Sequence, residues 1–147
     1  MVVARNEAAA IKMQSAFVAE LPPDSGLQIS FINVESLLTD NLSHEFAVLV
    51  NTTSIGVSDM LVPDWYEALI AAVARQQQRS FFYDMVYARG NSPTLLQGVA
   101  SRVGLPNSDG LQMLIGQALL AFQFWTGLEI SANVMSSGLQ AEQSTGC

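Results

Sequence analysis

The run Phe46-Ala47-Val48-Leu49-Val50 most constrains the fold, because it is apolar at every position. A continuous apolar run of this length is typical of a strand that is buried on both faces of a parallel sheet. The run is followed by Asn51-Thr52-Thr53-Ser54-Ile55-Gly56, whose small polar residues are typical of a turn. We therefore expect a central strand, followed by a loop that a ligand can approach closely.

Strands and helices are predicted to alternate along the chain. Apolar residues at helical spacing lie between β-branched or aromatic runs, and Asn6 can cap the first helix. This alternation predicts an α/β fold with a Rossmann-like, doubly wound, mostly parallel sheet and helices on both faces. The expected strands span residues 1–4, 27–32, 46–50 and 80–87, and the expected helices span residues 6–20, 34–38, 63–75, 93–103, 110–126 and 131–143.

Three of these helices carry apolar stripes that should face a core. The stripes consist of Ala9, Ala10, Met13, Phe17 and Leu21 in the first helix, of Trp65, Leu69, Ile70 and Val73 in the third, and of Leu111, Leu114, Ile115, Ala118, Leu119 and Phe122 in the fifth.

Length and charge limit the classes of protein. A length of 147 residues with 50% hydrophobic content predicts a single domain over residues 1–147. The formal net charge is -7, and the six Lys and Arg residues are scattered singly. A nucleic-acid partner is not expected, because no basic stripe could neutralise successive phosphates.

Cysteine usage and hydropathy bear on the compartment. Cys147 is the only cysteine, so no disulfide can form within the chain, and a cytoplasmic, reducing compartment is the natural interpretation. The residues after Met1 form neither a signal nor a transit peptide. The apolar stretch Leu111–Leu128 contains three glutamines, which favours a buried helix over a membrane span.

Few residues offer catalytic chemistry. The lone histidine, His44, precedes the central strand, so it should lie at the opposite end of the sheet from the ligand cleft. The sequence has no Cys/His metal constellation, and we predict no metal site. Asp84 lies in an apolar strand and needs a partner; a structural role for this carboxylate and a functional one are about equally expected.

Four motifs in order identify a family. They are Asn51–Gly56, the run Ser80-Phe81-Phe82-Tyr83-Asp84-Met85-Val86-Tyr87, the run Asp109-Gly110-Leu111-Gln112-Met113-Leu114-Ile115-Gly116-Gln117-Ala118, and Ala121-Phe122-Gln123-Phe124-Trp125-Thr126-Gly127. Their order and spacing resemble the nucleotide-binding half of shikimate dehydrogenase. The resemblance implies NADP as cofactor, and shikimate or 3-dehydroshikimate as a small-molecule substrate; quinate is not separated from shikimate by these residues.

The resemblance also implies roles for single residues. Arg5 follows the first strand, where an arginine can pair with the 2′-phosphate of NADP; the alternative is an ordinary exposed arginine. The family often has a second basic residue where this chain has Ala9. Without the resemblance, the other candidates would be assigned to a turn, the core or a neighbouring loop. The implied cofactor contacts are Arg5, Asn6, Asn51, Met85 and Gly110, and the implied substrate contacts are Tyr87 and Gln117.

The resemblance covers only part of the family's fold. The first strand with its Gly-rich turn, and the substrate domain with the catalytic Lys and Asp, have no counterpart in the chain. The only lysine, Lys12, lies in the first helix and cannot replace the catalytic one. We therefore expect a partial NADP-binding domain that has no catalytic residue, is inactive alone and can self-associate through exposed sheet edges. The alternative is a non-catalytic remnant that binds nucleotide weakly, or only with a partner chain.

Overall fold

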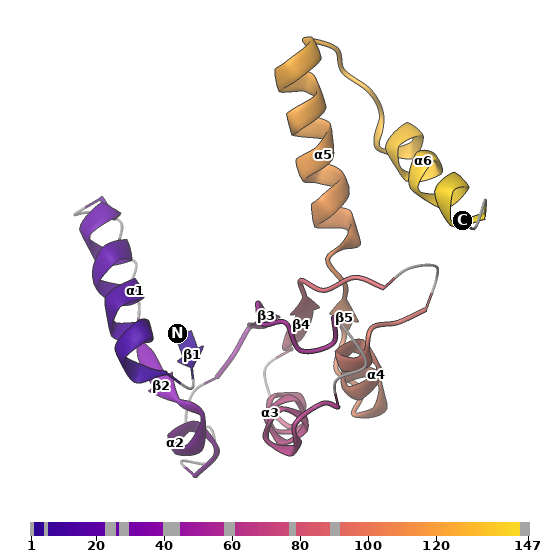
Figure 1. Cartoon of the computed structure of the whole chain (residues 1–147). Helices are drawn as coiled ribbons and strands as arrows, with labels where there is room; N and C mark the ends of the chain where they lie inside the picture. The colour runs from indigo at the N-terminus through magenta and orange to yellow at the C-terminus, as the bar shows by residue number, and fades with distance from the viewer. Residues whose placement is uncertain are drawn as a thin grey trace. The chain divides into compact units, whose positions relative to one another are not determined.

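The computed structural model describes two compact units, which are taken separately here (Figure 1). The first unit comprises Met1–Glu45 and the second Phe46–Cys147. The single domain expected over residues 1–147 stays a prediction. Arg5 and His44 lie outside the described residues. The described residues are 2–4, 6–22, 26, 30–39, 45–57, 61–76, 79–88 and 92–144.

The first unit is a strand–helix–strand–helix segment. Its elements are β1 (Val2–Ala4), α1 (Glu7–Glu20), β2 (Phe31–Asn33) and α2 (Val34–Thr39). Strands β1 and β2 pair in parallel, with Ala4 opposite Asn33. The predicted cap of α1 is confirmed, because the Asn6 side chain accepts a hydrogen bond of 3.0 Å from the Ala9 amide.

The apolar stripe of α1 is only partly covered. Ala10 is buried, but Met13 and Phe17, which were expected to face a core, are exposed. The two strands of this unit are three residues long each, so they cover only part of a helix of 14 residues. The prediction for Met13 and Phe17 is therefore wrong for this unit.

The second unit carries a parallel sheet of three strands. Its elements are β3 (Val48–Asn51), α3 (Asp64–Ala74), β4 (Phe81–Asp84), α4 (Leu95–Arg102), β5 (Asn107–Ser108), α5 (Leu111–Thr126) and α6 (Ala132–Ser144). The strand order is β3-β4-β5, with Asn51 opposite Asp84 and Tyr83 opposite Ser108. Parallel strands joined through helices confirm the predicted α/β class.

The position of β3 differs from the prediction. We expected a central strand buried on both faces, but β3 forms the edge of the described sheet and pairs with β4 alone. Leu49 is buried, whereas Val48 and Val50 are 53% and 46% exposed. The reason is that α3 and α4, which contact each other, cover only one face of this sheet in Figure 1.

The strand β4 ends earlier than predicted, and β5 was not predicted. The expected strand over residues 80–87 stops at Asp84, whose carboxylate accepts a hydrogen bond of 3.1 Å from the Val86 amide. This local bond takes an amide that would otherwise extend the ladder. Strand β5 is only the dipeptide Asn107–Ser108, which is too short and polar to give a sequence signal.

The core of the second unit lies between the sheet and the two helices α3 and α4. Three of the four predicted α3 residues are buried as expected, but Tyr66 takes the place of Trp65, which is only half-buried. The two rings stack with centroids 4.9 Å apart. The main buried apolar side chains are Tyr66, Leu69, Ile70, Val73, Phe82, Leu96, Val99 and Ala100.

Helix α5 extends away from the sheet, and α6 contacts it (Figure 1). Of the stripe predicted in α5, Ile115 is buried and the other members are half-buried. Leu120, Phe124 and Trp125 are exposed. No helix in the described part of the chain is long and apolar enough to cross a membrane.

Thr94 fixes the start of α4 and ties it to β4. Its hydroxyl oxygen accepts from the Gln97 amide at 3.1 Å, and the Gln97 side chain accepts from the Thr94 amide at 2.9 Å, which is a capping box. The same hydroxyl donates to the Asp84 carboxylate at 2.6 Å. One buried threonine therefore joins a helix to the end of a strand.

We expect Thr94→Val to lower the free energy of unfolding by about 1–3 kcal/mol. The valine keeps the shape but removes both the cap and a hydrogen bond to a buried carboxylate. Urea unfolding followed by circular dichroism measures the change. Thr94→Ser is the matched control, because it retains the hydroxyl; an equal loss in both variants would contradict the role given to that hydroxyl.

Candidate functional site

The carboxyl ends of β3 and β4 meet the start of α5 through backbone hydrogen bonds. The Met85 amide donates to the Asn51 carbonyl at 3.1 Å, and the Gly110 amide donates to the Val86 carbonyl at 3.1 Å. These bonds bring together three residues that the sequence analysis selected separately, namely Asn51, Met85 and Gly110. Ligands of open parallel sheets bind at this end of the strands.

Gly110 is needed here for space rather than for its backbone conformation. Its φ angle of -82° is available to any residue. A Cβ atom at this position would overlap the Met85 carbonyl oxygen and lie 2.8 Å from the Met85 carbonyl carbon. The first turn of α5 can therefore approach the end of β4 only because residue 110 has no side chain.

The carboxylate of Asp84 lies at the centre of the site and is wholly buried. One of its oxygens, Oδ1, accepts from the Asn51 side-chain amide at 2.8 Å and from the Val86 amide at 3.1 Å. The other, Oδ2, accepts from the Thr94 hydroxyl at 2.6 Å. These donors satisfy a charge that would otherwise be costly to bury, so the partner required by the sequence is found.

Asn51 uses its side chain to hold the loop that follows β3. Its Oδ1 accepts from the Thr53 amide at 3.1 Å and from the Thr53 hydroxyl at 2.7 Å, while its Nδ2 donates to Asp84. The side chain is fully buried. Its polar atoms are therefore engaged with the protein, and the loop that it shapes is the part that a ligand can reach.

Tyr66 contributes to the electrostatics beneath the site. Burial raises the pKa of its hydroxyl, and the negative charge of Asp84 raises this pKa further. The tyrosine therefore stays neutral throughout the ordinary pH range. This arrangement avoids a second negative charge close to the buried carboxylate.

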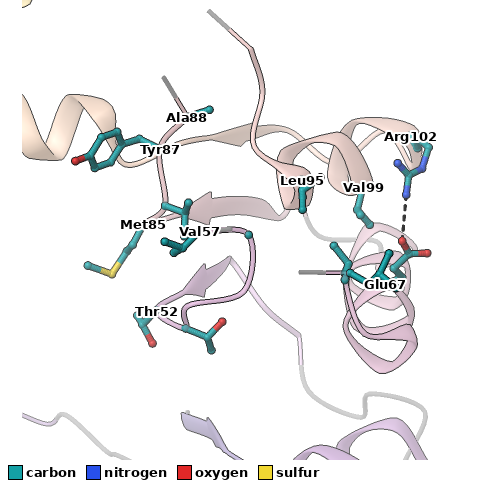
Figure 2. A pocket seen from close by; sticks show the side chains of 14 residues that line it. Thr52, Val57, Glu67, Met85, Tyr87, Ala88, Leu95, Val99 and Arg102 are labelled. Atoms are coloured by element: carbon teal, nitrogen blue, oxygen red, sulfur yellow. Dashed lines mark hydrogen bonds and ion pairs between the residues drawn. The ribbon is translucent and has the colours of Figure 1, made fainter. Parts of the chain in front are cut away.

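A cleft of about 1160 Å³ opens beside these strand ends (Figure 2). Figure 2 shows Thr52 and Met85 on one side of the cleft, and Leu95, Val99 and Arg102 on the other. An ion pair of 3.2 Å joins Arg102 to Glu67, and both side chains are exposed. The cleft is thus lined by the loop after β3, the segment that leads into α3, α3 itself at Glu67, the segment after β4 and one face of α4.

The two predicted substrate residues lie at the surface. Tyr87 and Met85 both line the cleft, and their exposed fractions are 46% and 39%. Gln117 is exposed on α5. Neither Gln117 nor Gly110 lines the cleft. Gly110 is the residue that caps the start of α5, and Gln117 lies within that helix.

The remaining predicted residues belong to the first unit. Asn6 is exposed, and its side-chain oxygen caps α1. Lys12 is exposed on the same helix. No group of His, Cys, Asp or Glu that could hold a metal occurs among the residues that the structure describes.

Sequence reasoning missed Thr94 and Tyr66. Thr94 could have been found from the pattern Thr94-Leu95-Leu96-Gln97, a threonine followed three residues later by a glutamine, which is a capping-box signature. Tyr66 gave no such signal, because the neighbouring Trp65 fits the helical stripe equally well.

Comparisons of sequence give one consistent family. The profile of the Shikimate 5'-dehydrogenase C-terminal domain matches residues 110–136. The NADP(+) shikimate dehydrogenase of Psychrobacter arcticus is 36% identical over 107 residues, which are 73% of this chain and 33% of that protein. The enzyme of the same name from Geobacter metallireducens is 33% identical over 133 residues, 90% of this chain and 41% of that protein. The chain therefore spans between a third and a half of these relatives.

Solved structures show the same likeness. The shikimate dehydrogenase of Aquifex aeolicus superposes with a TM-score of 0.63 at 25% identity, over 92% of this chain and 42% of that one. A shikimate dehydrogenase solved in complex with NADP+ gives a TM-score of 0.69 at 23% identity, over 94% of this chain and 44% of that one, which supports the Rossmann-like fold. The four motifs, the profile match and the shared fold agree, and the chain belongs to the shikimate dehydrogenase family.

Proposed function

We propose that this chain is the NADP- and substrate-binding portion of a shikimate dehydrogenase. In the complete protein, bound NADP exchanges a hydride with the substrate, converting 3-dehydroshikimate to shikimate and back. The observation that carries the proposal is the convergence of Asn51, Met85 and Gly110 at the carboxyl ends of β3 and β4. We place the protein in the cytoplasm, on the evidence of its single, terminal cysteine.

The size and the chemistry of the cleft suit one half of a dinucleotide cofactor. Its volume of about 1160 Å³ is sufficient for a ligand of that size, and apolar walls alternate with threonine hydroxyls. Met85 then contacts the nicotinamide side through backbone atoms, and the Asn51 loop supplies the adjoining surface. Gly110, which does not line the cleft, is assigned to the same side from the resemblance. Arg5 and Asn6 are assigned to the adenosine side from the resemblance, Arg5 to the 2′-phosphate.

Substrate contacts are assigned to Tyr87 and Gln117. Both side chains are exposed, so their polar groups are available to the hydroxyls and the carboxylate of a small molecule such as shikimate or quinate. No catalytic residue is assigned to this chain. We expect the chain alone to show no measurable shikimate oxidation, since proton transfer by a positioned group contributes about 10²- to 10⁴-fold to such rates.

A second candidate function is supported by the open edge of β3. The amides of Phe81 and Met85 donate to Ala47 and Asn51, so the backbone groups of Val48 and Val50 point to the opposite side, where no described strand pairs with them. Such an edge is a template for another strand. The chain would then be a remnant that binds nucleotide weakly, or only when a partner chain covers this edge.

The central test is the binding of NADP and NAD to the 147-residue chain by isothermal titration calorimetry. We expect NADP to bind more tightly than NAD, and Arg5→Ala to weaken NADP by about 10- to 100-fold, because a phosphate–arginine contact is lost. NAD should be little affected. Arg75→Ala removes the same charge from α3 as a control; equal losses for both cofactors would exclude Arg5 as the phosphate contact.

Gly110→Ala should weaken NADP binding by about tenfold, because the new Cβ pushes α5 away from the Met85 carbonyl group. Gly116→Ala is the matched control in the same helix, since a Cβ there meets nothing within 4 Å. The control should be neutral or stabilise the chain by about 0.5–1 kcal/mol. Unchanged NADP affinity in Gly110→Ala would remove the start of α5 from the cofactor site.

Self-association through β3 should depend on protein concentration and be weakened by a charge on that strand. Light scattering after size exclusion should show dimers whose fraction falls in Val50→Lys, because a lysine on an edge strand opposes pairing. Val103→Lys, which places the same charge at the exposed end of α4, is the control. Equal dimer fractions in the two variants would exclude the β3 edge as the interface.

A further inference from the structure

Three of the segments that line the cleft are joined to one side chain, the carboxylate of Asp84. The loop after β3 is held through Asn51, the segment after β4 through the amide of Val86, and the start of α4 through Thr94. The cleft residues Thr52, Met85 and Leu95 each adjoin one of these points in the sequence. The carboxylate itself does not line the cleft.

We propose that Asp84 is a positioning residue that sets the shape of the nicotinamide side of the cleft. The inference rests on the proposed cofactor site and deepens it. Asp84 contacts neither cofactor nor substrate; it acts through Val86, whose amide it holds and whose carbonyl accepts from Gly110, and through Asn51, whose carbonyl accepts from Met85. The backbone around Met85 is therefore fixed from both sides.

A carboxylate suits this position better than an amide. Three donors converge on its two oxygens, and an ionised carboxylate only accepts hydrogen bonds. In asparagine, one oxygen becomes an NH₂ group that must face a donor. If that group faces Thr94, two donors oppose each other, so the hydroxyl hydrogen must turn away while the hydroxyl oxygen still accepts from the Gln97 amide. Asparagine has nearly the same shape, so the change tests the hydrogen bonding without leaving a cavity.

The first experiment compares Asp84→Asn with the unaltered 147-residue chain by calorimetry, using two probes. NADP carries the nicotinamide, whereas 2′,5′-ADP carries only the phosphorylated adenosine half. We expect Asp84→Asn to weaken NADP by about tenfold and to change 2′,5′-ADP by less than about twofold, since charge-assisted hydrogen bonds are lost on the nicotinamide side alone. Asp64→Asn, the same change in the exposed first turn of α3, should alter neither.

Equal losses for the two probes would overturn the proposal, because they would show a general structural role. If Asp84→Asn does not fold, Thr94→Val takes its place, and the same difference between the probes is expected. Failure of the unaltered chain to bind NADP would count against the proposed function instead. In that case, a second measurement without any ligand decides the positioning role.

The second measurement is amide hydrogen exchange of the free chain. Asp84→Asn should reduce the protection of Val86, Thr53 and Gln97 together, because each amide is bonded within the network that the carboxylate joins. The amide of Val73 in the core of α3 should keep its protection. Loss at Val86 alone would overturn the proposal, since Asp84 would then cap a single turn rather than position three segments of the cleft.

Discussion

The carboxylate of Asp84 is the interaction on which the second unit depends. A buried negative charge is costly unless donors surround it, and here the donors come from β3, from the backbone after β4 and from the start of α4. Separate parts of the chain must therefore meet at one point for the charge to be tolerated. Because the buried charge needs these donors, only an arrangement that brings all of them to Asp84 is stable. Tyr66 stays neutral beside it, so the charge is not opposed by a second one.

A second constraint is steric and acts where the start of α5 meets the end of β4. Gly110 lets the start of α5 lie against the Met85 carbonyl group, and its amide bonds to Val86. Backbone atoms, rather than long side chains, thus form the base of the site. This construction suits a fold that approaches a flat cofactor ring closely. It also brings Asn51 and Gly110, which are far apart in the sequence and both buried, to the same end of the sheet.

Sequence reasoning predicted the elements better than their environments. The helices over residues 63–75 and 110–126 were confirmed nearly to their ends, because the periodicity of apolar residues is a local property of the sequence. The central position of β3 was wrong, since an apolar run does not reveal which neighbours pair with it. The end of β4 was misplaced because the side chain of Asp84 takes the Val86 amide, and this local bond competes with the bonds of the sheet. The exposure of Gln117 could not be predicted from its apolar neighbours in the sequence. Helix α5 extends away from the sheet, and the helix that it contacts in this unit is α6.

The buried and the exposed polar groups of the second unit differ in what they can contact. In the described part of the second unit, Asp84 is the only fully buried ionisable side chain, and its oxygens are occupied by donors from the protein. It cannot take a proton from a substrate without losing the bonds that hold the cleft together. Tyr87 and Met85 line the cleft and are exposed, so they offer a ligand a hydroxyl and a thioether as contacts. The exposed residues of the cleft are therefore open to a ligand, whereas the buried carboxylate is committed to holding the fold.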